Sequence, residues 1–122
     1  MIDKRIRELE RGAGVIQSLG QVVGRNVRRL RQDRDWTLDD VAQVARDLGM
    51  QWSNSRVNNI QRGARNPKFS TLLVLARVFE CSVGELLQTD AEKIDLGEVL
   101  VSADELQAQV VDTPGALGWV LC

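Results

Sequence analysis

Residues 53–62 read SNSRVNNIQR, and this stretch decides how the rest of the chain is interpreted. Val57 and Ile60 are its only apolar residues, and their spacing of three is typical of a narrow buried stripe on a short helix. Asn and Ser favour helices weakly because their side chains compete for backbone hydrogen bonds. A helix at this place therefore presents a polar surface at some cost in stability, and that surface needs an explanation.

Helical patterns also flank this stretch on both sides. Apolar residues recur at spacings of three and four, and Ser, Thr and Gly stand where helices begin and end. The expected helices span about residues 15–32, 37–48, 53–62, 70–79 and 82–87, with Ser70 and Ser82 as caps of the last two. Since no convincing strand precedes residue 88, the sequence predicts an all-α fold with a body of five helices.

The composition is typical of one small globular domain. The chain has 122 residues, of which 43% are apolar and 27% charged. No stretch approaches the roughly 20 apolar residues of a membrane helix, and the charged amino terminus does not lead into a signal-peptide core. Cys81 and Cys122 form neither a disulfide framework nor a metal-site spacing. We therefore expect a cytoplasmic protein without a membrane partner.

The charge is divided unevenly along the chain. Residues 1–87 carry 15 Lys and Arg against 10 Asp and Glu, whereas residues 88–122 carry one Lys against seven acids. The body is therefore basic, at +5, and the tail is acidic, at −6. A basic body is compatible with a polyanionic partner, and an ordinary surface of mixed charge is equally compatible with it.

Residues suited to catalysis are scarce. The chain has no His, which excludes imidazole as a general base and His-ligated metal sites. Gly12-Ala13-Gly14 does not continue as a dinucleotide-binding motif, because Gln17 stands at the third glycine position. Asp39 and Asp40 stand in the first turn of a predicted helix, where acids stabilise the helix dipole. We expect no enzyme activity, no cofactor and no metal.

The outer face of the helix at 53–62 is suited to reading DNA bases. Asn can bond adenine with two hydrogen bonds, Arg can do the same with guanine, and Ser can serve either base. Lys and Glu, which usually fill a merely solvated face, are absent from this helix. An inert polar surface is the alternative interpretation of the helix taken alone.

Three motifs, in this order and spacing, resemble the lambda-repressor-like helix-turn-helix family of the Cro/repressor or XRE type. The motifs are Gly24-x-x-Val27-Arg28-x-Leu30-Arg31 followed by Trp36-Thr37, then Val57-Asn58-Asn59-Ile60-Gln61-Arg62-Gly63 followed by Pro67, then Thr71-Leu72-x-x-Leu75-Ala76-x-x-Phe79-x-x-Ser82-Val83-x-Glu85-Leu86-Leu87. The resemblance covers about residues 22–87. It implies a five-helix DNA-binding domain at residues 22–88, with the helix at about 53–62 in the major groove.

The resemblance also implies two groups of contacts with DNA. Side chains on the outer face of the recognition helix would read base edges, and side chains around it would bind the sugar-phosphate backbone. The base-reading group is Asn54, Ser55, Arg56, Asn58 and Asn59. The backbone-binding group is Arg25, Arg65, Asn66 and Lys68.

This chain departs from the usual family pattern in two ways that bear on structure. The interval from Thr37 to Gly49 is longer than usual and so is the turn after it, which resembles a longer-turn variant among actinobacterial regulators. Where the family often pairs Arg31 with a Glu, this chain has Gln61. A neutral hydrogen bond is expected to replace that ion pair at little cost in stability.

The two ends of the chain are expected to be appendages. Residues 1–21 are predicted to form an amino-terminal helical extension, with Ile2, Ile6 and Leu9 on one face. Residues 89–122 are predicted to form an acidic tail with a strand at 99–101 and a helix at 103–111. The apolar terminus suggests that the tail serves dimerisation or docking, although folding back on the body is the alternative.

Together these features predict a sequence-specific regulator of transcription that binds double-stranded DNA. The resemblance favours a repressor of phage, mobile-element or actinobacterial type that binds its operator as a homodimer. The alternative is an antitoxin or another protein-interaction module whose tail binds a partner protein. The two functions are compatible, because antitoxins can also bind operators.

Overall fold

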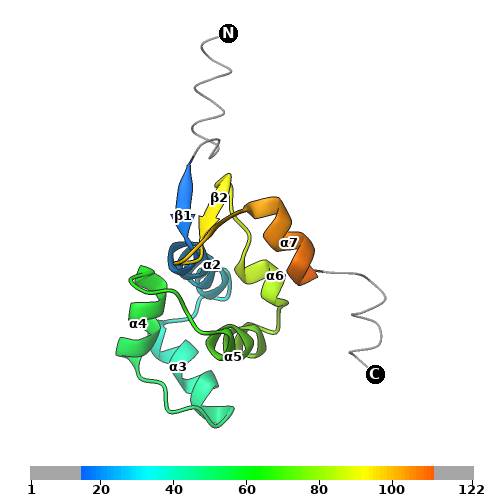
Figure 1. Ribbon diagram of the computed structural model, residues 1–122. Coiled ribbons are helices and arrows are strands. Elements are labelled where there is room, and N and C mark those ends of the chain that lie inside the picture. The colour runs from blue at the N-terminus through cyan, green and yellow to red at the C-terminus, as the bar shows by residue number, and fades with distance from the viewer. Residues whose placement is uncertain (1–14, 112–122) are drawn as a thin grey trace.

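Most helices begin and end where the sequence places capping residues. The structure, a computed structural model, describes residues 15–111. It gathers the helices around α5 and places a small sheet beside α2 and α7 (Figure 1). The helices are α2 (Leu19–Asp33), α3 (Leu38–Asp47), α4 (Asn54–Arg62), α5 (Phe69–Phe79), α6 (Val83–Leu86) and α7 (Ala103–Val111). The strands are β1 (Ile16–Ser18), β2 (Lys93–Asp95) and β3 (Leu100–Ser102).

The prediction of an all-α body is confirmed. Five helices, α2 to α6, lie within residues 19–86, and each described strand is only three residues long. Within the described residues 15–111, no helix has the length and apolar character needed to span a membrane. The predicted tail elements at 99–101 and 103–111 correspond to β3 and α7. The predicted helix with Ile2, Ile6 and Leu9, and the apolar end of the tail, lie outside the described residues.

α4 is the helix predicted from SNSRVNNIQR, and its register is fixed at both ends. The Ser53 hydroxyl accepts a hydrogen bond from the backbone N–H of Arg56 at 3.2 Å, which caps the helix. Gly63 follows the last residue in the left-handed conformation, with φ of 69°. Val57 is fully buried and Ile60 is half-buried, so the narrow apolar stripe faces the core as expected.

The starts of two helices differ from the prediction. α5 begins at Phe69 with Lys68 as its cap, so the prediction that Ser70 caps it is wrong. The helical hydrogen bonds begin at the Lys68 carbonyl oxygen, which accepts from the Leu72 N–H at 3.2 Å, so Phe69 and Ser70 already lie inside the helix. The first helix begins at Leu19 rather than near Val15, because the residues before it are extended.

A sheet joins the two ends of the described chain. β1 pairs with β2 in parallel and β2 pairs with β3 in antiparallel orientation, which gives the order β1-β2-β3. The expectation of no strand before residue 88 is therefore wrong. The partner of β1 is more than 70 residues away in sequence, as in the pairing of Gln17 with Ile94, so local pattern could not reveal it. This strand lies inside the range 1–21 that was predicted to be helical.

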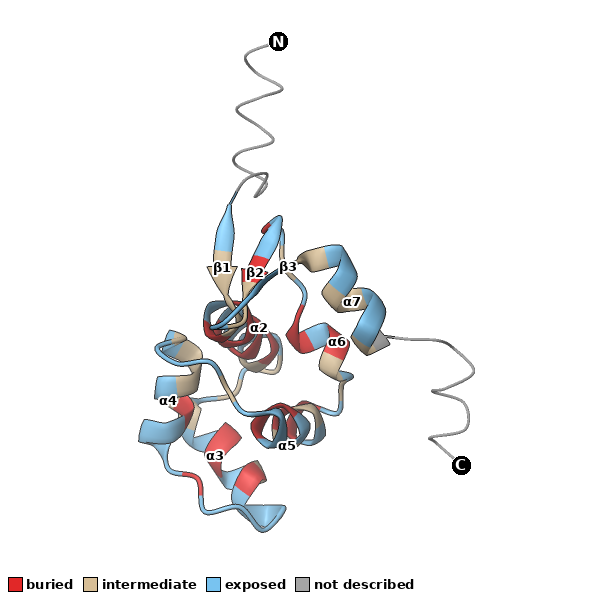
Figure 2. Cartoon of the chain, viewed as in Figure 1, coloured by how far each residue is buried: buried red, intermediate tan, exposed pale blue. Residues whose placement is uncertain are grey.

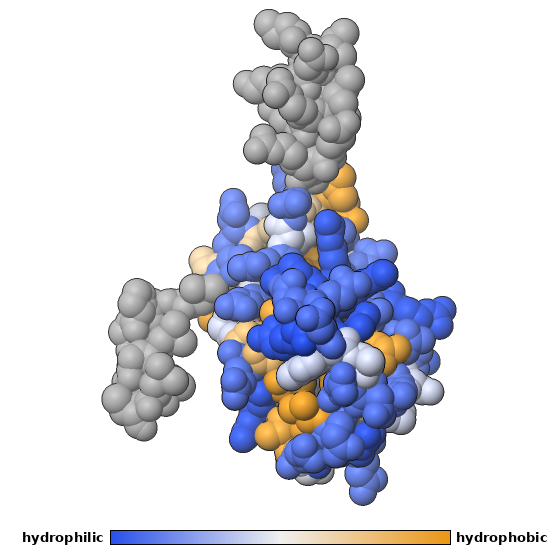
Figure 3. Space-filling view, turned by 180° about the vertical axis from the view of Figure 1, so that it is seen from behind, coloured by the Kyte–Doolittle hydropathy of each residue, from blue (hydrophilic) through white to orange (hydrophobic). Residues whose placement is uncertain are grey.

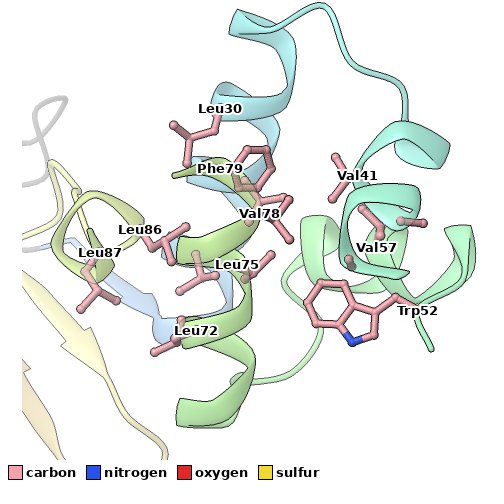
Figure 4. Close-up of a cluster of buried hydrophobic side chains, with 14 residues drawn as sticks. Leu30, Val41, Trp52, Val57, Leu72, Leu75, Val78, Phe79, Leu86 and Leu87 are labelled. Carbon is pink, nitrogen blue, oxygen red and sulfur yellow. The ribbon is translucent and has the colours of Figure 1, made fainter. Parts of the chain in front are cut away.

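The core lies between α2, α3, α5 and α6 and reaches α4 through Val57 (Figure 4). Phe79, Leu75 and Leu86 are its largest fully buried side chains. The buried faces of the helices point inward, while α4 exposes most of its surface (Figure 2). Seen from behind, the surface is mostly hydrophilic (Figure 3). An extended apolar patch lies in the half of the molecule that holds α3 and α5.

α4 is held against α2 by unusually close backbone contact. A Cβ atom added to Gly24 would lie 2.5 Å from the carbonyl oxygen of Gln61 and 2.7 Å from that of Ile60. A Cβ on Gly20 would collide with the carbonyl oxygen of Arg65, in the loop after α4. Only glycine fits at these two positions of α2, so they determine where α4 and its following loop lie.

The Gly24→Ala substitution tests this contact. Replacing Gly by Ala inside an ordinary helix stabilises the helix by about 1 kcal/mol. Here we expect the free energy of unfolding to fall by about 1–3 kcal/mol, because the new methyl group forces α4 away from α2. Urea unfolding followed by circular dichroism measures it.

The exposed Arg28 on the same helix provides the control for Gly24. Arg28→Ala should change the free energy of unfolding by less than about 0.5 kcal/mol. A Gly24→Ala protein as stable as the wild type would contradict the close-contact account.

Candidate nucleic-acid interface

α4 presents a row of short polar side chains to solvent. Asn54, Ser55 and Asn59 are exposed, as the sequence predicted, and none of them has a side-chain hydrogen bond within the described chain. Asn58 is half-buried, which makes it less accessible than predicted. The outer face of α4 therefore has donors and acceptors free to bond a partner.

A groove of about 910 Å³ lies beside this face. It runs between α4, the loop at 63–68 and the first turn of α5, and we call it the α4 groove. Six of the nine predicted contact residues line it, together with residues such as Ser53, Met50 and Ser70. The six are Ser55, Arg56, Asn59, Arg65, Asn66 and Lys68, and those outside it are Asn54, Asn58 and Arg25.

The α4 groove is positively charged. Arg56, Arg65 and Lys68 are its charged residues, and none of the described residues that line it is Asp or Glu. Charges of one sign along a concave surface raise the local concentration of a ligand of opposite sign. The groove therefore suits a polyanion, and its neutral hydroxyl and amide groups add hydrogen-bonding capacity.

Arg25 lies apart from the groove. It lines a separate hollow of about 520 Å³ with Arg29, Asp90 and Gln107 among others. The structure therefore does not bring Arg25 next to the loop residues that were predicted to share its role. Its contact with a DNA backbone stays a prediction.

Asn66 has a structural contact that the sequence did not reveal. Its Oδ1 accepts a hydrogen bond from the backbone N–H of Gly20 at 2.9 Å, across 46 residues of sequence. This bond satisfies one of the free N–H groups in the first turn of α2. Asn66 therefore ties the loop at 63–68 to α2, at the place where Gly20 meets that loop.

The long turn before α4 is anchored by residues that sequence reasoning missed. Trp52 is only 4% exposed, and its carbonyl oxygen accepts a hydrogen bond from Nη1 of Arg46 at 2.8 Å. The Cζ atom of Arg56 lies over the Trp52 ring, 5.3 Å from its centroid. The sequence could have indicated the role of Trp52, because an aromatic residue directly before a helix cap is suited to packing against the first turns of that helix.

Arg31 and Gln61 make the hydrogen bond that the sequence predicted in place of an ion pair, with the neutral Gln61 amide as acceptor. The Nε of Arg31 donates to Oε1 of Gln61 at 2.9 Å, and its Nη1 donates to the carbonyl oxygen of Trp36 at 2.8 Å. Arg31 thereby connects α2 to the end of α4 and to the turn before α3. The replacement of Glu by Gln at position 61 keeps this link.

The described chain offers little for catalysis or metal binding. No group of three or more His, Cys, Asp or Glu residues within it is placed to hold a metal ion. Burial raises the pKa of the Cys81 thiol, and the nearby carboxylate of Glu85 raises it further. The thiol is therefore protonated at neutral pH and is a poor nucleophile.

The sequence model of a helix-turn-helix domain family matches residues 22–89, more than half of the chain. The chain belongs to this helix-turn-helix domain family. The family lies within the lambda-repressor-like group, so the resemblance found over residues 22–87 is confirmed. Helix-turn-helix domains of this kind are typically not enzymes. Searches among curated proteins and solved structures found no match.

Substitution of Asn66 tests its structural contact with Gly20. Asn66→Ala removes the acceptor for the Gly20 N–H, and we expect the free energy of unfolding to fall by about 1 kcal/mol. Asn66→Asp keeps an acceptor oxygen at the start of α2, so its stability should stay within about 0.5 kcal/mol of wild type. Thermal and urea unfolding of both variants provide the comparison. Equal losses in the two variants would show that the side-chain oxygen is not the link.

Proposed function

We propose that this helix-turn-helix domain binds double-stranded DNA in a sequence-specific manner and regulates transcription. The observation that carries the proposal is the α4 groove, where a row of neutral hydrogen-bonding groups lies beside three positive charges. Membership of the helix-turn-helix family supports DNA binding independently of this geometry.

α4 would enter the major groove and read base edges. Asn54, Ser55 and Asn59 have short side chains, so their polar groups reach a base only when the helix backbone lies close to it. A cap at Ser53 and the buried Val57 hold the helix in one register, which directional hydrogen bonds require.

The loop at 63–68 would lie along the DNA backbone. The side chains of Arg65 and Lys68 are exposed and make no hydrogen bond or ion pair within the described chain, so their charges are free to bind phosphates. Such contacts set the position of the domain on the duplex without reading its sequence. The close contact of this loop with Gly20 and the hydrogen bond that Asn66 accepts from the Gly20 N–H hold it against α2.

We further propose that the protein is a repressor that binds its operator as a homodimer. A second copy would bury apolar side chains that are otherwise exposed. On α5, Phe69 is 67% exposed and Leu73, one turn later, is 45% exposed. Two-fold symmetric dimers bind paired half-sites, so the operator would be a palindrome.

Selection of bound duplexes from a random DNA pool tests the proposed function. We expect enrichment of one motif, arranged as two inverted half-sites separated by about one helical turn. A single unrepeated motif would support DNA binding and contradict the dimer. Absence of any enrichment would contradict sequence-specific DNA binding and would favour the protein-interaction module.

Substitution of Asn59 tests the assignment of base reading to α4. Asn59→Ala should weaken binding to the selected operator by about 1–3 kcal/mol, while binding to unrelated duplex changes little. Gln109, which is exposed on α7, provides the control, since Gln109→Ala should leave both affinities unchanged. Fluorescence anisotropy with both duplexes measures the effect. An unchanged operator affinity in the Asn59→Ala protein would contradict base reading by this residue.

Substitution of Lys68 tests the assignment of backbone binding. Lys68→Ala should weaken binding to all duplexes and lower the slope of log affinity against log salt concentration by about 0.9. Lys93 is an exposed lysine on the sheet, and Lys93→Ala should leave this slope unchanged. Equal slopes for the two variants would contradict the role of Lys68.

A further inference from the structure

The two walls of the α4 groove differ in chemistry. The α4 wall carries the neutral side chains of Ser55 and Asn59, which can accept and donate hydrogen bonds. The opposite wall is formed by the loop at 63–68 and the start of α5, and it carries Arg65 and Lys68. DNA has the same division, with uncharged base edges inside the major groove and charged phosphates along its rims.

Arg56 belongs to α4 in sequence, but its guanidinium group is held at the opposite wall. Its Nη2 lies 3.4 Å from Oγ1 of Thr71, in the first turn of α5. Its Cζ lies 5.3 Å from the centroid of the Trp52 ring, which supports one face of the group. Thr71 is 7% exposed and Trp52 is 4% exposed, so both supports are fixed in the protein.

We propose that Arg56 binds a phosphate of the DNA backbone and does not read a base. This inference rests on the proposed function and reassigns one of the five residues that the sequence places on the base-reading surface. A base-reading Arg must extend away from its helix into the DNA, and Arg56 could do so only by leaving both Trp52 and Thr71.

The Arg56 guanidinium group, in contact with Trp52 and Thr71, still has free N–H donors for a phosphate. Arg has five N–H donors, and the contact with Thr71 uses one of its terminal nitrogens, which leaves donors that can bond two phosphate oxygens. A guanidinium group can stack on an aromatic ring and still present its N–H donors at its edge. Arg65 and Lys68 line the same groove, so the three side chains can follow one DNA strand.

Thr71 is a positioning residue in this arrangement. It acts through Arg56, because its buried hydroxyl fixes where the guanidinium lies before DNA arrives. Holding a ligand-binding group in place beforehand reduces the entropy lost on binding. Removal of the hydroxyl should therefore lower affinity without removing a charge.

The test compares the selected operator with a scrambled duplex of equal length, by fluorescence anisotropy over a range of salt concentrations. For Arg56→Gln we expect affinity for both duplexes to fall by the same factor, within about twofold, so that the specificity ratio is kept. The slope of log affinity against log salt should fall by about 0.9, as for one lost phosphate contact. For Arg56→Lys the slope should return to the wild-type value, because the charge is restored.

Two further variants separate positioning and base reading from phosphate binding. Thr71→Val should weaken binding to both duplexes equally and keep the salt slope. Asn59→Ala should lower the specificity ratio by about 5- to 150-fold and keep the slope, which provides the contrast expected of a base contact. Thermal unfolding of each variant confirms that it is folded under the conditions of the binding experiment.

The outcomes distinguish the inference from the proposed function. A specificity ratio that falls at least tenfold in Arg56→Gln, with an unchanged slope, would overturn the phosphate assignment and uphold DNA binding. An Arg56→Gln protein that binds both duplexes like the wild type would also overturn it. Failure of the wild-type protein to bind either duplex would overturn the proposed function and the inference with it.

Discussion

The position of α4 depends on the contact between glycines of α2 and the carboxyl end of α4. Because Gly24 has no side chain, the carbonyl groups of Ile60 and Gln61 can lie directly against α2. The loop that follows α4 lies against Gly20 for the same reason. The helix α4 has only one fully buried side chain, Val57, so side-chain packing alone holds it weakly. Close backbone contact supplies the additional constraint, and it leaves the outer face of α4 free for polar residues with low helix propensity.

The remaining supports of the groove extend from this contact. Asn66 bonds to Gly20 and thereby holds the loop at 63–68 against α2. Arg46 and Trp52 fix the long turn at the other end of α4, and Trp52 in turn carries the Arg56 side chain. Each support joins a residue next to the groove to a buried or helical part of the body. The proposed reading of DNA requires side chains that stay in place to within a fraction of an ångström, and these links restrain the elements that line the groove.

Local sequence patterns predicted the helices, because caps and apolar spacing act over a few residues, whereas the loop residues Arg65, Asn66 and Lys68 were selected through the family resemblance. Ser53, Val57 and Gly63 define α4 in this way, and its exposed Asn and Ser side chains follow from its register. The roles of Asn66 and Arg56 were not predictable, since each depends on a partner that only the tertiary fold brings near. The strand at 16–18 was missed for the same reason, because it is stabilised by pairing with residues 93–95.

The most direct test of this account is an NMR titration of the isotope-labelled protein with the operator duplex. If α4 and the loop beside it form the DNA-binding surface, the largest backbone amide shifts will fall within residues 53–71. Small shifts are expected in α2, where Gly20 and Gly24 meet that segment. Shifts concentrated in β2, β3 and α7, with residues 53–71 unchanged, would contradict the central claim.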